Sequence, residues 1–275
     1  MTETEHRVTV ADGETVAAVH HEAPGDDWIV FCHGFLSDKT GSYERRCRRA
    51  VEHGYNAVRF DFRGCGASDG RFVDQTLSDK LADLHAVLEY VAPPSIVLFG
   101  SSFGGKVAFH AAVDDERVEA VATRAPVTYN RAFDEYRAIV EREDEPSGTS
   151  NRRAGAKRHA SREGPDGASG ETASEERHAN CAGIYEFETG DRIDARFFDD
   201  FETYEFDDVA ASLSVPVAIF HGRDDDSVDI GDSVDAAAAL ETDVLLEAFA
   251  TEGHRFSADA EDRLLERLFH WLETQ

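Results

Sequence analysis

A serine lies at the centre of the pentapeptide Gly-Ser-Ser-Phe-Gly at positions 100–104, which matches the pattern G-x-S-x-G. A short apolar run, Ser95–Phe99, precedes the pentapeptide, and a stretch that favours helix, Lys106–Val113, follows it. A sharp turn from strand to helix strains the backbone of its central residue and exposes that residue's hydroxyl at the helix N-terminus. The alternative is a glycine-rich turn that contains serines by chance. The spacing and its context favour Ser102 as a nucleophile.

A serine nucleophile needs a general base, and the base needs an acid that orients it. In chains with this motif both groups follow the serine, with the acid before the base. The spacing G-x-x-D-x-x-V across Gly222–Val228 selects Asp225 as the acid. The neighbouring Asp224 and Asp226 remain alternatives, because a run of aspartates in an acidic protein is usually solvated surface.

The base is predicted to be His254, the only histidine between the apolar run Val244–Phe249 and the last predicted helix. His270 lies inside that helix, where a packing role is the better explanation. The order Ser102, Asp225, His254 therefore completes the set of groups that a serine hydrolase needs.

The tetrahedral intermediate of acyl transfer carries an oxyanion, which two backbone amides are expected to bind. One is the N–H of Phe103, the residue after the nucleophile. The other is the N–H of Phe35, in the loop after the apolar run Trp28–Cys32. Gly34 would let this loop approach the substrate closely. His33 is expected to make structural hydrogen bonds rather than to take part in catalysis.

The elements that position these residues alternate along the chain. Apolar runs predict strands over Val8–Val10, Thr15–His20, Trp28–Cys32, Ala57–Phe62, Ser95–Phe99, Val118–Thr123, Val215–Phe220 and Val244–Phe249. The intervening stretches predict helices over Tyr43–Glu52, Leu77–Tyr90, Lys106–Val113, Ala236–Leu240 and Ala260–Leu272. Strands that alternate with helices imply βαβ crossovers, and therefore an α/β fold with a mostly parallel central sheet covered on both faces.

One long segment interrupts this alternation. Between Val140 and Ile184 the chain has no Val, Ile, Leu, Met, Phe, Trp or Tyr, so the segment 141–183 is predicted to be a disordered insertion. Its aromatic flanks, 129–140 and 184–204, are expected to form a small helical cap over the strand ends. The predicted organisation is a first core part over 1–126, a cap region over 127–208 and a second core part over 209–275.

The composition excludes several classes of partner. The 275 residues, 41% of them hydrophobic, include 28 Lys and Arg against 56 Asp and Glu, a net charge of −28 at pH 7. This charge argues against nucleic acid as a ligand, because phosphate binding needs a basic face. No apolar run approaches the ~18–20 residues that span a bilayer. The acidic N-terminus lacks the apolar region of a signal peptide. We therefore expect a cytoplasmic protein with no membrane partner, and its oligomeric state is open.

The basic residues are unusual in kind. Only four of the 28 are Lys, and the others are Arg. An excess of surface carboxylates with little Lys resembles proteins from halophiles, whose mutual repulsion is screened in molar salt. We expect a salt-adapted protein rather than an ordinary acidic one.

Cysteine and histidine spacing gives no sign of a metal or a disulfide framework. Cys32, Cys47, Cys65 and Cys181 form no C-x-x-C pair and have no regular spacing. Cys32 ends an apolar run and is expected in the core. The other histidines show no spacing typical of metal ligands, and we expect neither a metal nor a cofactor.

Together these residues resemble the α/β-hydrolase superfamily along the whole chain except the polar insertion. Residues 61–72 and 74–77 resemble the D-x-x-G-x-G-x-S-D-G-x-F and D-x-T-L segments of small serine esterases of the feruloyl/cinnamoyl esterase type. In those proteins a His-Gly-Phe loop supplies the first oxyanion residue, and the G-x-S-x-G serine is the nucleophile. The resemblance implies the same site at the matching positions Phe35, Ser102, Phe103, Asp225 and His254.

Two features depart from the family's pattern. Ser101 stands where that family commonly has His, which changes little in the predicted site. The long polar insertion lies inside the cap, so the resemblance does not assign the family's substrate to this chain. The charged residues Asp61, Arg63 and Asp69 are expected to hold their loop, and we assign them no catalytic role.

The leading function is hydrolysis of a small-molecule carboxylic ester through an acyl-enzyme, without a cofactor. The aromatic flanks of the cap suggest an apolar or aromatic acyl group. Thioesterase, peptidase or amidase, and acyltransferase activities remain open, because the same groups serve each of them. A non-catalytic ligand-binding protein on this fold is a further alternative, which the loss of Ser, His or Asp would have favoured.

Overall fold

A computed structural model describes residues 2–10, 13–142 and 183–275. Its centre is an eight-stranded sheet in the order β1-β2-β4-β3-β5-β6-β9-β10. Strand β2 pairs antiparallel with β1 and with β4, and the other neighbours are parallel. The strands are β1 (Glu3–Thr9), β2 (Thr15–His21), β3 (Trp28–Cys32), β4 (Asn56–Phe60), β5 (Ile96–Ser101), β6 (Val118–Arg124), β9 (Val217–Gly222) and β10 (Val244–Phe249). The prediction of an α/β fold with a mostly parallel sheet is confirmed.

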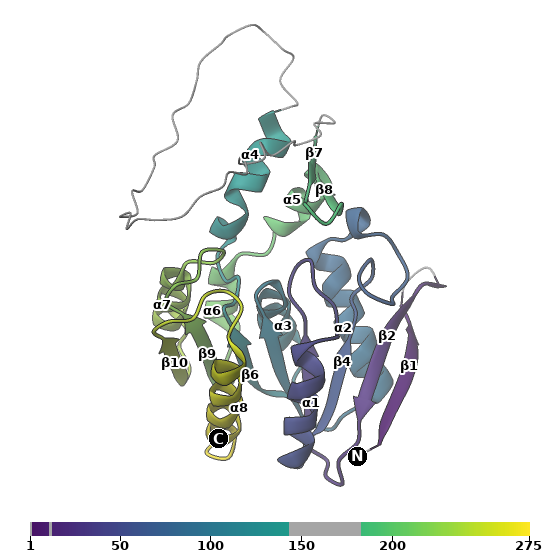
Figure 1. Cartoon of the computed structure of the whole chain (residues 1–275), viewed down its shortest axis with the longest axis vertical. Coiled ribbons are helices and arrows are strands. Elements are labelled where there is room, and N and C mark those ends of the chain that lie inside the picture. Colours follow the sequence, from purple (N-terminus) through teal and green to yellow (C-terminus); the bar gives the residue numbers. More distant parts are fainter. Residues whose placement is uncertain (1, 11–12, 143–182) are drawn as a thin grey trace, which may run out of the picture.

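Helices cover both faces of the sheet (Figure 1). One face carries α1 (Ser42–Glu52) and α8 (Ala258–Leu272). The other carries α2 (Leu77–Val91), α3 (Phe103–Asp114), α6 (Phe206–Ser212) and α7 (Ile230–Ala239). The parallel strands are therefore buried on both sides, as continuous apolar runs predict.

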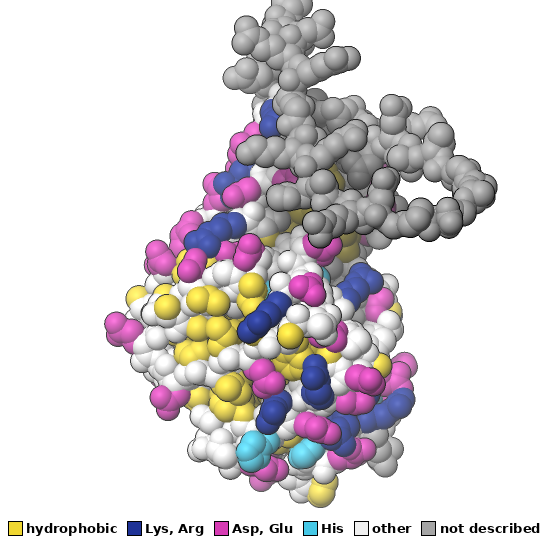
Figure 2. Space-filling model, turned by 60° about the vertical axis from the view of Figure 1, so that its left-hand side comes forward, with side chains coloured by type: hydrophobic (Ala, Val, Ile, Leu, Met, Phe, Trp, Pro, Cys, Tyr) yellow, Lys and Arg dark blue, Asp and Glu magenta, His cyan; other side chains and the backbone are white. Residues whose placement is uncertain are grey.

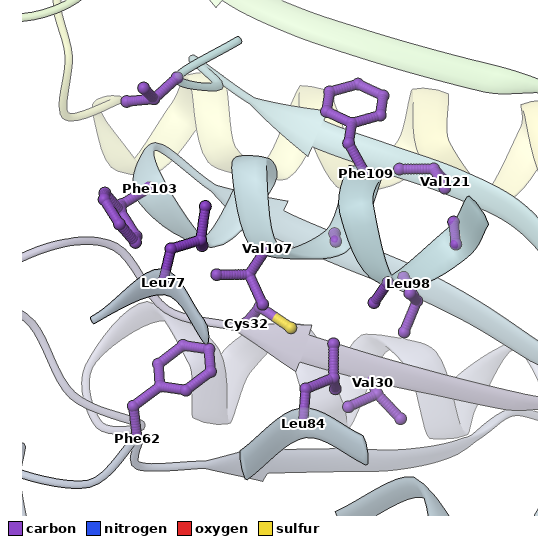
Figure 3. Close-up of a cluster of buried hydrophobic side chains, with 14 of the residues drawn as sticks. Val30, Cys32, Phe62, Leu77, Leu84, Leu98, Phe103, Val107, Phe109 and Val121 are labelled. Atoms are coloured by element: carbon purple, nitrogen blue, oxygen red, sulfur yellow. The ribbon is translucent and has the colours of Figure 1, made fainter. Parts of the chain in front are cut away.

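The core between the sheet and its helices fixes the elements on either side of the predicted nucleophile. Figure 3 shows Val30 and Cys32 of β3 and Leu98 of β5 packed with Val107 of α3 and Leu84 of α2. None of these five side chains is exposed, which confirms the core position predicted for Cys32. Burying an aliphatic side chain of this size stabilises a fold by about 1.5–3 kcal/mol.

Most predicted elements occur with shifted ends, while β3 and β10 have the predicted bounds. Helix α3 begins at Phe103 rather than Lys106, because two glycines in its first turn conceal the helical pattern. Helix α7 begins at Ile230 rather than Ala236, because the Asp229 side chain accepts a hydrogen bond from a backbone amide and caps the first turn.

Strand β1 begins at Glu3 rather than at the predicted Val8, and it lies at an edge of the sheet. Its side chains alternate between exposed and more buried positions. An edge strand with one solvated face carries polar residues, so it gives little apolar signal.

Between β6 and β9 the chain forms a cap beyond the carboxyl ends of the parallel strands (Figure 1). The cap contains α4 (Asp134–Arg142), β7 (Ile184–Glu186), β8 (Arg192–Asp194) and α5 (Ala195–Phe201). Strands β7 and β8 pair antiparallel, so the prediction of a helical cap missed a hairpin whose strands are too short to show alternation. Of the predicted insertion over 141–183, residues 143–182 lie outside the described residues.

Candidate active site

The turn between β5 and α3 presents the Ser102 hydroxyl. Ser102 has φ 53° and ψ −120°, a conformation that residues with a side chain rarely adopt. A Cβ at Gly100 would overlap the Gly104 carbonyl, and a Cβ at Gly104 would overlap the Cys32 carbonyl. The two glycines of the G-x-S-x-G pattern are therefore required by space.

The Ser102 hydroxyl begins a chain of hydrogen bonds. Its Oγ lies 3.0 Å from Nε2 of His254, and Nδ1 of His254 lies 2.8 Å from Oδ2 of Asp225. The structure thus brings together the three residues predicted as nucleophile, base and acid. The alternatives Asp224 and Asp226 are exposed to either side of Asp225.

The Asp225 carboxylate has no exposed surface. The amides of Ser227 and Val228 each donate to its Oδ1 at 2.9 Å, and Nε2 of His221 lies 3.1 Å from its Oδ2. Burial alone would raise the pKa of Asp225, but hydrogen bonds from His221 and His254 outweigh burial and lower that pKa below its ordinary value. The carboxylate is therefore ionised at neutral pH and can stabilise a positive charge on His254.

His221 is a residue of the site that the sequence analysis missed. It is fully buried at the end of β9, with Nδ1 2.7 Å from the Ser233 hydroxyl and Nε2 3.0 Å from the Val228 carbonyl. Because Nε2 faces a carbonyl oxygen as well as the carboxylate of Asp225, Nε2 carries the proton and donates it. The signal in the sequence was a His-Gly pair at a strand end, with His221 at i and the predicted acid Asp225 at i+4.

The predicted oxyanion donors, the amides of Phe35 and Phe103, belong to residues whose ring centroids lie 5.4 Å apart. Phe103 is the first residue of α3, so its N–H has no partner within the helix. A Cβ at Gly34 would lie 3.3 Å from the Ser102 Cβ, so the loop that carries Phe35 passes directly beside Ser102. Within the described residues, neither of the two amides donates a backbone hydrogen bond.

His33 fixes this loop. Its Nδ1 lies 2.8 Å from the Gly34 carbonyl, and its Nε2 accepts a hydrogen bond from the Phe62 amide at 3.1 Å. A ring that donates from one nitrogen and accepts at the other is neutral. Burial, together with the nearby Lys80 charge, lowers the pKa of His33 to about 4. These contacts confirm the structural role predicted for His33.

The residues predicted to have no catalytic role lie away from the hydrogen-bonded chain. Each loop charge holds a neighbouring element: Asp61 accepts from the Lys39 amide at 2.6 Å, Arg63 pairs with Asp83 at 2.6 Å, and Asp69 accepts from the Thr15 amide at 2.8 Å. The packing role predicted for His270 was wrong, because 75% of its side chain is exposed on the solvent face of α8.

The fold and this constellation agree with a known family. The family described as alpha/beta hydrolase fold matches residues 27–260. The chain belongs to this family. The match includes both predicted oxyanion residues and the whole hydrogen-bonded chain from Ser102 to Asp225.

Sequence relatives match this α/β hydrolase over part of its length. The mitochondrial palmitoyl-protein thioesterase ABHD10 of Mus musculus is 35% identical over 89 residues, 31% of this chain and 29% of the relative. The quorum-quenching protein AidA of Acinetobacter baumannii is 30% identical over 109 residues, 36% of this chain and 35% of the relative. Each match thus covers only about a third of the relative's own length.

Solved structures match nearly the whole chain. The alpha/beta hydrolase domain-containing protein 10 from mouse has a TM-score of 0.74 at 20% identity, over 98% of this chain and 97% of that chain. Est1E from Butyrivibrio proteoclasticus with bound ferulic acid has a TM-score of 0.74 at 19% identity, over 98% of both chains. At these identities the similarity shows the fold.

A cavity of about 700 Å³ opens beside Ser102 in this α/β hydrolase. Its walls are the loop after β3, the start of α1 and the loop that carries His254. Arg124, which ends β6, and Glu261 of α8 also line it. The cavity gives access to Ser102 and His254 from the side of α1 and α8.

On the cap side, aromatic rings pack around Phe35 and Phe103, the two predicted oxyanion residues. Their centroids lie 5.0 to 6.4 Å apart. We call this set the aromatic cluster: Phe35, Phe72, Phe103, Phe133, Phe187, Phe197 and Phe201. Because the rings fill the space between the cap and the core, they brace the backbone at both predicted oxyanion donors.

Ser101, the departure from the family's pattern, has a partner of its own. Its hydroxyl accepts a hydrogen bond from Nη1 of Arg46 at 2.8 Å, and Nε of Arg46 pairs with the Glu261 carboxylate. Burial would raise the pKa of Glu261, but the charge of Arg46 outweighs burial and lowers it. A buried ion pair between α1 and α8 therefore supports the turn that carries Ser101 and Ser102. Together with Arg124 we call this pair the buried charge cluster.

In the part of the chain that the structure describes, no group of three or more His, Cys, Asp or Glu side chains could hold a metal ion. No helix within the same residues has the length and apolarity to cross a bilayer.

Cys32, Cys47 and Cys65 are buried free thiols, and burial raises the pKa of Cys32 and Cys47. Cys181 lies outside the described residues. Figure 2 shows a face on which Asp and Glu side chains are interspersed with Lys and Arg.

Proposed function

We propose that this α/β hydrolase is a serine hydrolase that cleaves carboxylic esters of small molecules through an acyl-enzyme. The observation that carries the proposal is the unbroken hydrogen-bonded chain from the Ser102 hydroxyl through His254 to the buried Asp225. Because Asp225 accepts a hydrogen bond from Nδ1–H of His254, Nε2 carries no proton and can accept the proton of the serine.

In the proposed reaction, Oγ of Ser102 attacks the acyl carbon while its proton moves to Nε2 of His254. The amides of Phe35 and Phe103 bind the oxyanion of the tetrahedral intermediate. His254 then gives the proton to the departing alcohol, the bond from acyl carbon to alcohol oxygen breaks, and the acyl group stays on Ser102. A water that loses its proton to His254 attacks this ester. The bond from the acyl carbon to Oγ then breaks, His254 returns the proton to Oγ of Ser102, and the carboxylic acid leaves. The proposed reaction uses no cofactor.

A thioester is the second candidate substrate. It is favoured by the 35% identity over 89 residues with a palmitoyl-protein thioesterase. The two reactions differ in the leaving atom and need the same nucleophile, base and oxyanion donors. The resemblance to feruloyl/cinnamoyl esterases supports an aromatic acyl group within the ester proposal.

The test compares p-nitrophenyl esters of graded chain length with a matched acyl thioester, using the wild type and Ser102→Ala. The assays contain molar KCl, because we propose that a surface with net charge −28 is adapted to high salt. We expect Ser102→Ala to lower kcat/KM by roughly 10³-fold or more while the protein stays folded. The ratio of ester to thioester turnover then identifies the leaving atom.

Ser95→Ala is the matched control, since Ser95 lies next to the opposite end of β5. This control should retain wild-type turnover. Ester hydrolysis that persists in Ser102→Ala would refute the assignment of the nucleophile. A folded wild type that hydrolyses neither ester nor thioester would support the alternative of a non-catalytic binding protein.

A further inference from the structure

Arg124 is the last residue of β6 and lies beside the predicted nucleophile. Its carbonyl accepts a hydrogen bond from the Ser102 amide at 2.9 Å, and it lines the same cavity as Ser102 and His254. The guanidinium carbon lies 5.7 Å from the centroid of the Phe256 ring. A positive charge therefore stands at the wall of the space that a substrate would enter.

Among the residues that the structure describes, none forms a hydrogen bond or an ion pair with the Arg124 guanidinium, although its Nε is shielded from solvent. Burial and the neighbouring charge of Arg46 lower the pKa of Arg124. The carboxylates of Glu261 and Asp225, neither of which forms an ion pair with Arg124, offset this lowering only in part. A shielded donor without a partner costs free energy, so its retention needs an explanation.

Neighbouring arginines do have partners. Arg46 pairs with Glu261, and Arg45 pairs with Asp262. Carboxylates are abundant in a chain with 56 acidic and 28 basic residues. In the described structure no carboxylate forms an ion pair with Arg124, which points to an anion that a ligand supplies.

The remaining charges of the cavity wall agree with this interpretation. The charged lining residues are Arg45, Arg124, Arg255, Asp38 and Glu261. Glu261 is offset by Arg46, which lies behind the wall, and Asp38 accepts hydrogen bonds from the amide and hydroxyl of Thr40. Arg45 is likewise offset by Asp262, so Arg124 and Arg255 remain against the one carboxylate of Asp38. The cavity wall is therefore positive on balance in a protein whose net charge is −28.

We propose that the substrate of this site carries a carboxylate or phosphate group, which Arg124 binds while the acyl carbon lies against Ser102. This inference rests on the proposed function and adds the chemical class of its substrate. A planar guanidinium can donate two parallel hydrogen bonds to either anion, which a neutral ester cannot accept in the same way. Arg124 is therefore a specificity-determining residue.

The experiment measures kcat/KM for neutral and anionic esters that share the reacting group. On the acyl side, p-nitrophenyl hexanoate is compared with the p-nitrophenyl half-ester of adipic acid. On the alcohol side, methyl 4-acetoxybenzoate is compared with 4-acetoxybenzoate and with 4-acetoxyphenyl phosphate. The readout is the ratio of anionic to neutral kcat/KM, which cancels differences in the amount of active enzyme.

We expect the wild type to have a higher kcat/KM for the anionic ester than for the neutral ester in at least one comparison. The comparison that shows this preference tells whether the charge lies on the acyl side or the alcohol side and whether it is a carboxylate or a phosphate. Arg124→Gln should lower this ratio by roughly 10–100-fold, and Arg124→Lys should restore part of it. Arg117→Gln is the matched control, because Arg117 pairs with Asp115 outside the cavity. The control should keep the wild-type ratio.

Binding of the product anions gives a readout that does not need turnover. Adipate, 4-hydroxybenzoate and 4-hydroxyphenyl phosphate are titrated into the wild type, Ser102→Ala and Arg124→Gln, with calorimetry as the detector. Anion binding that Ser102→Ala keeps and Arg124→Gln loses supports the inference even if no ester is hydrolysed. The absence of ester hydrolysis would contradict only the proposed function. A wild type that prefers the neutral ester in every comparison, or that binds none of these anions, overturns the inference.

Discussion

The two walls beside Ser102 differ in chemistry. On the cap side, the aromatic cluster packs ring against ring around the oxyanion residues. On the side of α1 and α8, the buried charge cluster pairs Arg46 with Glu261 and leaves Arg124 facing the cavity. An apolar wall gains stability from surface removed from water, whereas each buried charge must be compensated individually. Substitutions in the two walls should therefore differ in how much stability they remove and in whether that loss depends on pH.

The largest expected effect lies between the walls, at the acid of the hydrogen-bonded chain. Asp225→Asn should lower kcat by roughly 10⁴-fold, because the amide no longer selects the tautomer of His254 that accepts the serine proton. Steady-state kinetics and a melting curve separate this loss from unfolding. Asp224→Asn is the control, since Asp224 is exposed next to it and should leave kcat unchanged. Equal losses in the two variants would contradict the assignment of Asp225.

In the charged wall, Glu261→Gln should destabilise the protein by about 3–5 kcal/mol, because it leaves the Arg46 charge buried without compensation. The free energy of unfolding in denaturant measures this loss. The double variant Arg46→Met with Glu261→Leu should recover much of it, since no isolated charge remains. A single variant as stable as the wild type would show that the pair does not support the turn.

Acid should weaken the loop that carries Phe35. The pKa of His33 falls from 6.5 to about 4 on folding, so between these values the unfolded chain binds the proton that the native protein excludes. Stability is therefore present above pH 6.5 and is lost as the pH falls toward 4, by about 1–3 kcal/mol. Denaturant unfolding as a function of pH measures the slope. His33→Gln should flatten it, whereas His270→Gln, at an exposed position, should not.

The aromatic wall should give the smallest effect. Phe197→Leu keeps an apolar side chain at a buried position of the cap, and we expect a loss of about 1–2 kcal/mol without any change in the pH dependence. The same variant should alter the preference among acyl chains if the cap contacts the acyl group. A loss that varied with pH as that of Glu261→Gln does would remove the distinction between the two walls.

The sequence was sufficient for the parts of the site that local rules determine. The pattern around Ser102 has a steric cause, since a Cβ at Gly100 or Gly104 would overlap a neighbouring carbonyl. The spacing that selected Asp225 also has a local cause, because the amides of Ser227 and Val228 donate to that carboxylate. The sheet followed from continuous apolar runs in the same way.

The rest depends on contacts between residues far apart in the chain. Arg46 meets Glu261 only because α1 and α8 share one face of the sheet. His221 supports the acid through a geometry that a His-Gly pair does not reveal. That Arg124 has no partner among the described residues is a property of its surroundings, so no spacing rule could have identified it.

Chemical trapping shows directly whether Ser102 is a nucleophile that His254 activates. The wild type and His254→Ala are treated with a fluorophosphonate, digested and examined by peptide mass spectrometry. We expect one adduct in the wild type, on the peptide that contains Ser102, and labelling that is slowed by orders of magnitude in His254→Ala. An adduct on another residue, or ester turnover by a protein that Ser102 labelling does not inhibit, would contradict this expectation.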